Sequence, residues 1–223
     1  MQNIIVSDIC DTLYYSNTTF DFIKYCITTK KIKTKSWLFR SVISKKNPLF
    51  WIAAIFQKAV KIDIPKKIAV SLLKGFKTTE VDQFAINFYH EFLEPRKIIE
   101  VHDLMNTFDK EDLVLASSTI EPVARVIAKN LQIPAFVATS LGIKNGRYTG
   151  KITREISGRK IQALTDHYKG VLPKISCAIS DNYTDMPLIK MATAKYAVCY
   201  SNKDQYYWGH VLGLKVISVQ KID

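Results

Sequence analysis

Residues 3–13 read NIIVSDICDTL, and this stretch decides the fold. The run NIIV has the apolar character of a buried strand, and Asp8 comes just after it. Two later stretches repeat the pattern, since DLVLA precedes Ser117 and ISCAIS precedes Asp181, with Asp185 following soon after. Short apolar runs that each end in a polar group are typical of a parallel sheet with its active site at the carboxyl edge. The sequence therefore predicts an α/β fold with a parallel sheet.

The stretch after the first strand predicts helices instead of strands. Between residues 15 and 94, apolar residues recur every three or four positions, with breaks at Pro48, Pro65 and Gly75. After Pro95 helical and extended patterns alternate again. The expected helices are near 96–108 and 121–131, from about Gly158, and near 186–191, and the expected strands are near 112–116, 134–138, 175–180, 195–199 and 215–219. Asn145-Gly146 in LGIKNGRYTGKI predicts a hairpin. We therefore expect an α/β core of residues 1–14 and 95–223, interrupted by an all-α cap at 15–94.

Composition places the chain among ordinary globular proteins, with 48% hydrophobic and 23% charged residues in 223. The net charge of +12 is concentrated in one segment, because Lys24 to Lys77 holds 14 Lys or Arg against one acid, Asp63. Such a segment attracts anions such as phosphorylated metabolites, anionic lipid or nucleic acid, or it is simply a solvated face of the helical unit. Both interpretations stay open.

Two further features bear on location. The chain passes from Met1-Gln2 directly into a strand, without the basic and apolar regions of a secretory signal. The four cysteines show no CxxC spacing, so we expect reduced thiols and a cytoplasmic location.

The polar residues at the strand ends suggest metal-assisted phosphoryl chemistry. Asp8 is a candidate nucleophile, because a carboxylate can attack phosphorus and form an aspartyl phosphate. Mg²⁺ neutralises a phosphate and prefers oxygen ligands, and Asp8 and Asp181 could provide them. Lys160 and the Ser117 hydroxyl could hold the other phosphate oxygens, and Asp185 could orient Lys160 or a metal-bound water.

These motifs resemble those of the haloacid dehalogenase superfamily, in its phosphoserine-phosphatase-like branch with a helical cap between the first two motifs. DICDTL resembles the first motif, usually DxDGT, and LASSTIEPVARVIAKNLQI is similar to the second motif and its helix. TSLGIKNGRYTGKI resembles the hairpin of this branch, GRK the third motif, and SDNYTDMPLI the fourth. The resemblance implies a Rossmann-like core with an inserted cap.

The resemblance also implies a Mg²⁺-dependent phosphomonoester hydrolase that acts through an aspartyl phosphate on a small phosphorylated metabolite or a lipid phosphate. The implied catalytic residues are Asp8, Lys160 and Asp185. The implied substrate-binding residues are Ser117, Ser118 and Lys160, and the implied metal ligands are Asp8, Asp181 and the backbone carbonyl of Cys10.

The chain departs from the family pattern at Cys10, where phosphatases of the family carry an acid–base aspartate. General acid–base catalysis contributes roughly 10²–10⁴-fold in rate, so its loss is serious. Asp11, where Gly is usual, either caps the turn or supplies a carboxylate one place along. A catalytically weak or inactive phosphate-binding protein is therefore the alternative. A dehalogenase is less favoured, because dehalogenases of the superfamily work without Mg²⁺ and typically lack the acid that this chain keeps as Asp181.

The segment from Trp37 to Phe56 combines aromatic side chains with lysines. These side chains form either the core of the cap or an amphipathic surface that lies on an anionic membrane, as in branch members with apolar caps that act on phosphatidylglycerophosphate-type lipids. A membrane span is not expected, because the longest charge-free stretch here, Asn47 to Gln57, has 11 residues and a span needs about 20. Nucleic acid is not an expected partner, since no recognised binding motif accompanies the charge.

Overall fold

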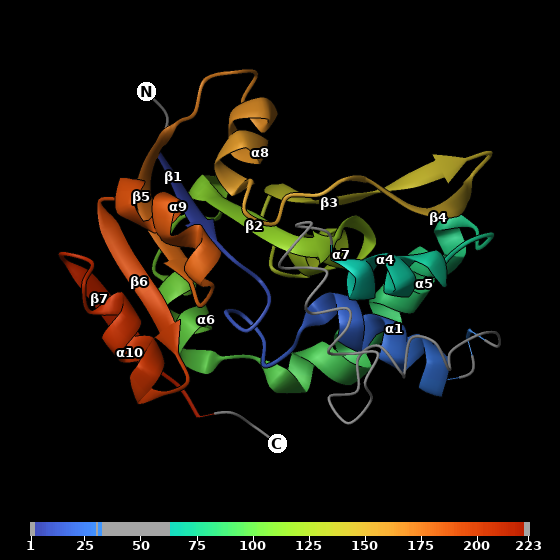
Figure 1. Cartoon of the computed structure of the whole chain (residues 1–223), viewed down its shortest axis with the longest axis horizontal. Coiled ribbons are helices and arrows are strands. Elements are labelled where there is room, and N and C mark those ends of the chain that lie inside the picture. Colours follow the sequence, from blue (N-terminus) through green and yellow to red (C-terminus); the bar gives the residue numbers. More distant parts are fainter. Residues whose placement is uncertain (1–2, 30, 33–62, 221–223) are drawn as a thin grey trace.

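The computed structural model describes residues 3–29, 31–32 and 63–220, and within them a seven-stranded sheet forms the centre (Figure 1). The strands follow the order β4-β3-β2-β1-β5-β6-β7. They are β1 (Asn3–Ser7), β2 (Leu113–Ile120), β3 (Ala135–Lys144), β4 (Arg147–Arg154), β5 (Lys174–Ser180), β6 (Ala194–Cys199) and β7 (Leu214–Ser218). β3 and β4 pair antiparallel, and every other neighbouring pair is parallel. The predicted α/β fold with a parallel sheet is confirmed.

Helices cover both faces of this sheet. They are α1 (Thr18–Thr28), α4 (Ile64–Ser71), α5 (Thr78–Phe88), α6 (Ile99–Asn106), α7 (Glu121–Asn130), α8 (Lys160–His167), α9 (Met186–Met191) and α10 (Asn202–Trp208). Short helical turns lie at Tyr89–Leu93, Glu94–Arg96, Lys110–Asp112 and Tyr183–Asp185.

The alternating direction of the side chains along β1 places them in two buried clusters, one on each face of the sheet. Successive strand side chains point to opposite faces, so Ile5 joins the buried cluster with residues of α1, α4, α5, α6 and α7. Ile4 and Val6 join the other cluster, with residues of α8, α9 and the end of α10. β1 is buried on both faces, which its continuous apolar run predicts.

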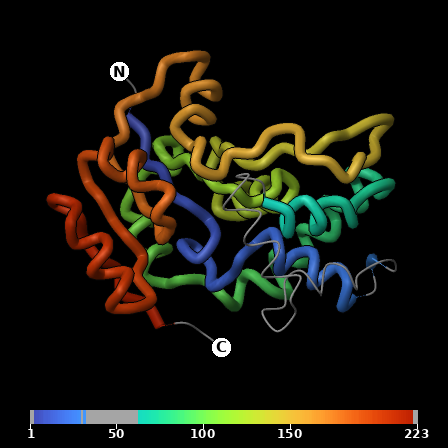
Figure 2. Tube along the Cα trace, in the orientation of Figure 1, coloured from blue at the N-terminus to red at the C-terminus, as the bar shows by residue number. Residues whose placement is uncertain are grey.

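The helices α4 and α5 lie beside the β3–β4 hairpin, and α1 packs against these two helices, as Figures 1 and 2 both show. Backbone hydrogen bonds tie the hairpin to the turn before α5, from Gly75 N to Tyr148 O (2.8 Å) and from Thr78 N to Gly146 O (2.9 Å). Buried side chains of the three helices, such as Phe22 of α1 and Phe88 of α5, belong to the same cluster as Leu115 of the sheet. The division into a core of 1–14 and 95–223 and a cap of 15–94 stays a prediction.

The sequence signals located most elements. The Asn145-Gly146 hairpin is present, and both residues have positive φ (51° and 69°), as this two-residue turn requires. The helices expected around residues 33–62, and the aromatic segment within them, lie outside the described residues. β3 continues to Lys144 because its second half pairs with β4 instead of ending near residue 138. Of the helices that the structure describes, none is long and apolar enough to cross a bilayer.

Candidate functional site

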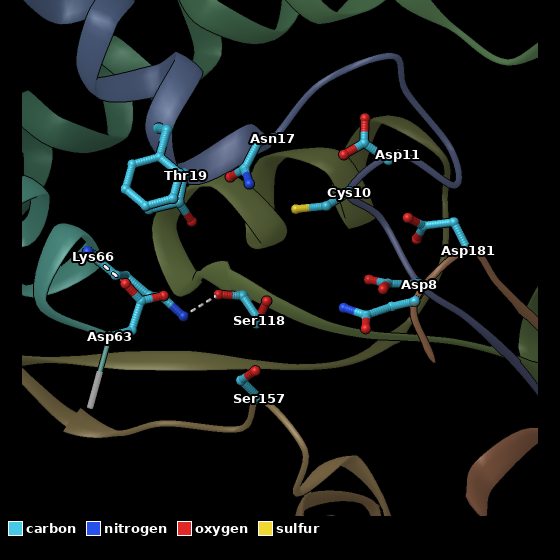
Figure 3. A pocket seen from close by; sticks show the side chains of 12 residues that line it. Asp8, Cys10, Asp11, Asn17, Thr19, Asp63, Lys66, Ser118, Ser157 and Asp181 are labelled. Atoms are coloured by element: carbon cyan, nitrogen blue, oxygen red, sulfur yellow. Dashed lines mark hydrogen bonds between the residues drawn. The ribbon is translucent and has the colours of Figure 1, made fainter. Parts of the chain in front are cut away.

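A polar pocket lies at the carboxyl edge of the sheet, where β1 is flanked by β2 and β5 (Figure 3). It has a volume of about 120 Å³. The sheet order brings the ends of these three strands together, so residues more than a hundred positions apart share one cavity. The described residues that line it are Asp8, Cys10, Asp11, Asn17, Thr19, Phe20, Asp63, Lys66, Ser118, Ser157, Asp181 and Asn182.

Behind the pocket, Lys160 joins two of the predicted site residues. Lys160 is the first residue of α8, and its Nζ lies 2.7 Å from Asp8 Oδ2 and 2.5 Å from Asp185 Oδ2. Ser180 Oγ donates a further hydrogen bond to Asp185 Oδ2 (2.6 Å). Burial by itself lowers the pKa of the Lys160 ammonium, but Asp8 and Asp185 outweigh burial and hold it above its usual value. Lys160 is therefore a fixed positive charge beside Asp8.

Asp8 is held from two sides at the end of β1. The Ile9 amide donates to Asp8 Oδ1 (2.6 Å), and Lys160 contacts the other carboxylate oxygen. The side chain is 5% exposed, yet it lines the pocket. A carboxylate that is oriented by two donors and open to a cavity suits nucleophilic attack.

Asp181 lies near Asp8 on the same side of the pocket (Figure 3). Its carboxylate accepts from Thr12 Oγ1 (2.9 Å), and its backbone N–H donates to the same hydroxyl (3.0 Å). Burial raises the pKa of Asp181 well above its usual value, and the negative charges of Asp8 and Asp11 add to the rise. Three carboxylates thus converge on a small space.

This donor set fits Mg²⁺. In the described parts of the chain, no group of three His, Cys, Asp or Glu side chains is arranged to hold a metal ion on its own. Mg²⁺ does not need such a cage, because it is usually held by one or two carboxylates together with waters and substrate phosphate. The mutual repulsion of Asp8, Asp11 and Asp181 is what a divalent cation would relieve.

The two serines of the second motif point in different directions. Ser117 pairs with Ala138 of β3, whereas the next pairing joins Ile120 to Thr139, so β2 bulges at the two residues between. Ser117 is fully buried, and its hydroxyl lies 3.0 Å from Thr119 Oγ1. Ser118 lies in the bulge and lines the pocket (Figure 3).

Cys10 lines the pocket with a thiol that is hydrogen-bonded to two hydroxyls. Its Sγ lies 2.9 Å from Thr18 Oγ1 and 3.2 Å from Thr119 Oγ1. Burial raises the pKa of this thiol, and the charge of Asp8 raises it further. The group at the acid–base position of the family is therefore a neutral thiol, a poor proton donor to an alkoxide leaving group at neutral pH.

Asp11 stands in the loop after β1 with a φ of 48°, in the left-handed region. Its backbone carbonyl accepts a hydrogen bond from Tyr200 OH (2.7 Å). Gly, which the family pattern has at this position, adopts this conformation without strain. Asp tolerates it better than most residues, and it also adds a carboxylate to the pocket.

Several lining residues lie outside the motifs and were not predicted from the sequence. Asn17 and Thr19 come from the start of α1, Lys66 from α4, and Ser157 from the loop before α8. No local signal marks Lys66, because it is one lysine among many in the basic segment. Ser157 follows Glu155, whose side chain accepts from the amides of that loop, but only the fold brings the loop to the pocket.

Comparison with known proteins agrees with the fold and the motifs. The family model of haloacid dehalogenase-like hydrolases matches residues 5–190, so the chain belongs to this family. No curated protein matches the sequence.

Three solved structures illustrate the likeness. A protein with unknown function from Bordetella pertussis Tohama I is similar with a TM-score of 0.75 and 17% identity, over 97% of this chain and 98% of that one. A probable phosphoserine phosphatase from Vibrio cholerae has a TM-score of 0.56 and 16% identity, over 92% of this chain and 58% of that one. A phosphoserine phosphatase determined as a phospho-aspartyl intermediate analogue has a TM-score of 0.54 and 16% identity, over 100% of this chain and 95% of that one. The family model confirms the predicted superfamily, and the likeness to these structures confirms the fold.

Proposed function

We propose that this chain is a Mg²⁺-dependent phosphomonoester hydrolase that acts through an aspartyl phosphate on Asp8. The observation that carries the proposal is the buried Asp8–Lys160–Asp185 arrangement, in which the ammonium contacts both carboxylates at 2.7 and 2.5 Å. Asp8 also lines a pocket together with Asp181 and Ser118. An ion pair with a purely structural role would not need this access to a cavity. Membership of the hydrolase family supports the same reading.

In the proposed reaction, an Asp8 carboxylate oxygen attacks phosphorus and the bond from phosphorus to the leaving oxygen breaks. The leaving oxygen takes a proton from solvent water and departs as an alcohol. Water then attacks the phosphorus of the aspartyl phosphate, which breaks the bond to Asp8, returns a proton to the solvent and releases inorganic phosphate. Lys160 holds Asp8 in place and offsets the charge of the phosphoryl group. The hydroxyls of Ser117 and Ser118 are proposed to donate hydrogen bonds to the substrate phosphate. For Ser117 this requires the hydroxyl to rotate away from Thr119 Oγ1.

Asp8, Asp181 and the backbone carbonyl of Cys10 are the proposed holders of Mg²⁺. When bound, the ion supplies positive charge that neutralises the phosphate and the converging carboxylates. Asp185 keeps Lys160 oriented, and Thr12 keeps Asp181 oriented through two hydrogen bonds.

The proposal is tested by phosphate release from sugar phosphates, phosphoamino acids, nucleotides and lipid phosphates, with and without Mg²⁺. We expect release that requires the metal and disappears in Asp8→Asn, which keeps the shape of the side chain but not the nucleophile. Asp103→Asn, at an exposed position of α6, is the matched control and should retain activity. Folded wild-type protein that releases no phosphate from any class would contradict the proposal.

A second candidate is a phosphate-binding protein with weak or no turnover. Cys10 favours it, because a neutral thiol stands where the family has an acid–base carboxylate. This candidate predicts binding of inorganic phosphate without hydrolysis of the panel. A dehalogenase stays the least favoured reading, and a 2-haloacid in the same panel tests it.

We further propose a cytoplasmic protein whose basic, aromatic segment contacts anionic membrane peripherally, which favours a lipid phosphate over a soluble metabolite. The composition of residues 37–56 supports it, and that segment lies outside the described residues. A small soluble phosphate ester is the alternative substrate, and the panel compares the two.

A further inference from the structure

Lys66 is a buried lysine that the motifs of the family do not include. It is the third residue of α4 and is 4% exposed. Its backbone N–H donates to Asp63 Oδ1 (2.9 Å) at the start of the helix. A lysine is rarely buried this completely unless its charge is paired. The groups around the Lys66 ammonium therefore indicate the role of this residue.

Three groups accept the hydrogen bonds of the Lys66 ammonium. They are the Ser118 backbone carbonyl at 2.6 Å, Thr139 Oγ1 at 2.9 Å and Glu155 Oε1 at 2.9 Å. An ammonium has three donors, so this set uses all of them. Burial raises the pKa of Glu155, but Lys66 outweighs burial and holds it below its usual value. Lys66 lines the pocket, but its ammonium donates its hydrogen bonds to protein acceptors (Figure 3).

The first of these contacts holds the bulge in β2. Ser118 and Thr119 have no opposite residue in β3, so the strand ladder does not hold the Ser118 carbonyl. Lys66 and the Thr139 hydroxyl hold it instead, at 2.6 and 3.0 Å. The bulge directs Ser118 into the pocket and places Thr119 beside Cys10.

The contact with Glu155 reaches a second wall of the pocket. Glu155 Oε1 accepts from the backbone amides of Ile156 (2.9 Å) and Ser157 (3.0 Å), and Ser157 lines the pocket. The same loop leads into Lys160 at the start of α8. One buried ammonium thus connects α4, the second motif and the approach to the third.

We propose that Lys66 is a positioning residue of the hydrolase, which ties α4 to the Ser118 bulge and to Glu155 and so holds two walls of the phosphate pocket in place. The effect on turnover rests on the proposed function, whereas the effect on the bulge does not. Without the ammonium, the Ser118 carbonyl loses a partner, the bulge relaxes, and the Ser118 hydroxyl leaves its place in the pocket. Phosphate binding then weakens.

The test uses Lys66→Met, the double variant Lys66→Met/Glu155→Gln, and Lys67→Met as the matched control. Lys67 is the exposed neighbour on the same helix. The double variant removes both charges, so it separates loss of positioning from the strain of an unpaired carboxylate. Three quantities are measured: the melting temperature, the KM and kcat for p-nitrophenyl phosphate with Mg²⁺ beside the Kd of inorganic phosphate, and amide hydrogen exchange of peptides that cover 113–120.

We expect Lys66→Met to lower the melting temperature by roughly 5–10 °C and the double variant to recover most of that loss. In both variants KM and the phosphate Kd should rise about tenfold with little change in kcat, because a ground-state contact is lost. Exchange at 113–120 should be faster in both variants, and Lys67→Met should match the wild type.

Two outcomes overturn the inference. If KM and exchange return to wild-type values in the double variant together with stability, Lys66 is only a structural charge. If exchange at 113–120 is unchanged in both variants, Lys66 does not hold the bulge. A wild-type protein that neither hydrolyses p-nitrophenyl phosphate nor binds inorganic phosphate contradicts the proposed function instead, and the exchange data still decide whether Lys66 positions Ser118.

Discussion

Replacing Cys10 with aspartate tests whether the hydrolase lacks only its acid–base group. The Cys10 thiol lies 2.9 Å from Thr18 Oγ1 and 3.2 Å from Thr119 Oγ1, so an introduced carboxylate finds two hydroxyl donors in place. Burial and the charge of Asp8 raise the pKa of the thiol here, and they would also raise that of a carboxyl group, which favours proton donation near neutral pH.

The expected gain is the full contribution of general acid–base catalysis, about 10²–10⁴-fold in kcat. This corresponds to roughly 2.7–5.5 kcal/mol of transition-state stabilisation. The introduced carboxylate also joins Asp8, Asp11 and Asp181, so we expect a lower melting temperature that Mg²⁺ partly restores.

The assay compares initial rates of p-nitrophenyl phosphate hydrolysis for the wild type, Cys10→Asp and Cys10→Asn with saturating Mg²⁺. The asparagine variant controls for size and hydrogen bonding, because it has no acidic proton to transfer. Equal rates for the two variants would refute the reasoning, since the missing group would then not be the acid. In that case the phosphate-binding reading gains support.

Three further results are expected. Lys160→Met leaves the buried carboxylate of Asp8 without its cation, so the free energy of unfolding, measured in urea, should fall by about 3–5 kcal/mol; a loss below 1 kcal/mol would mean that the charge is not needed there. Burial lowers the pKa of His102 from 6.5 to about 4, so the neutral ring contributes full stability above pH 6.5, and this is lost as the pH falls toward 4. The free energy of unfolding should lose up to about 2 kcal/mol from this group between pH 8 and pH 5. In His102→Gln this loss between pH 8 and pH 5 should disappear, and in the control His167→Gln, at an exposed position, it should remain. If His102→Gln and the wild type lose the same free energy of unfolding over this pH range, the loss does not come from His102. Vesicles with anionic lipid should co-sediment the protein at low salt and release it at high salt, and failure to co-sediment at low salt would exclude the membrane contact.

Most of the fold was predictable because its signals are local. The apolar runs before Asp8, Ser117 and Asp181 are the strands β1, β2 and β5, and Asn145-Gly146 makes the predicted turn. The helix α10 is not predicted from the sequence, although the Ser201 hydroxyl caps its start by accepting from the Asp204 backbone N–H and donating to the Asp204 carboxylate. The helix has only seven residues, and its polar and aromatic side chains show no clear apolar periodicity.

The candidate site was predictable where it follows the strand ends. Asp8, Lys160 and Asp185 are brought into contact, and Asp181 lines the same pocket as Asp8. The different directions of Ser117 and Ser118 were not predicted, because a bulge depends on the register with β3 and not on the local pattern.

By itself the sequence determined the α/β class, the family and the order of the motif residues, because side-chain alternation, turn residues and motif spacing are encoded within short stretches. Only the tertiary structure decided which lysine of the basic segment becomes a buried partner of the site. Lys66 meets Ser118 and Glu155 at separations of 52 and 89 residues. A buried charge is stable only where its partners converge, and that convergence is a property of the folded chain.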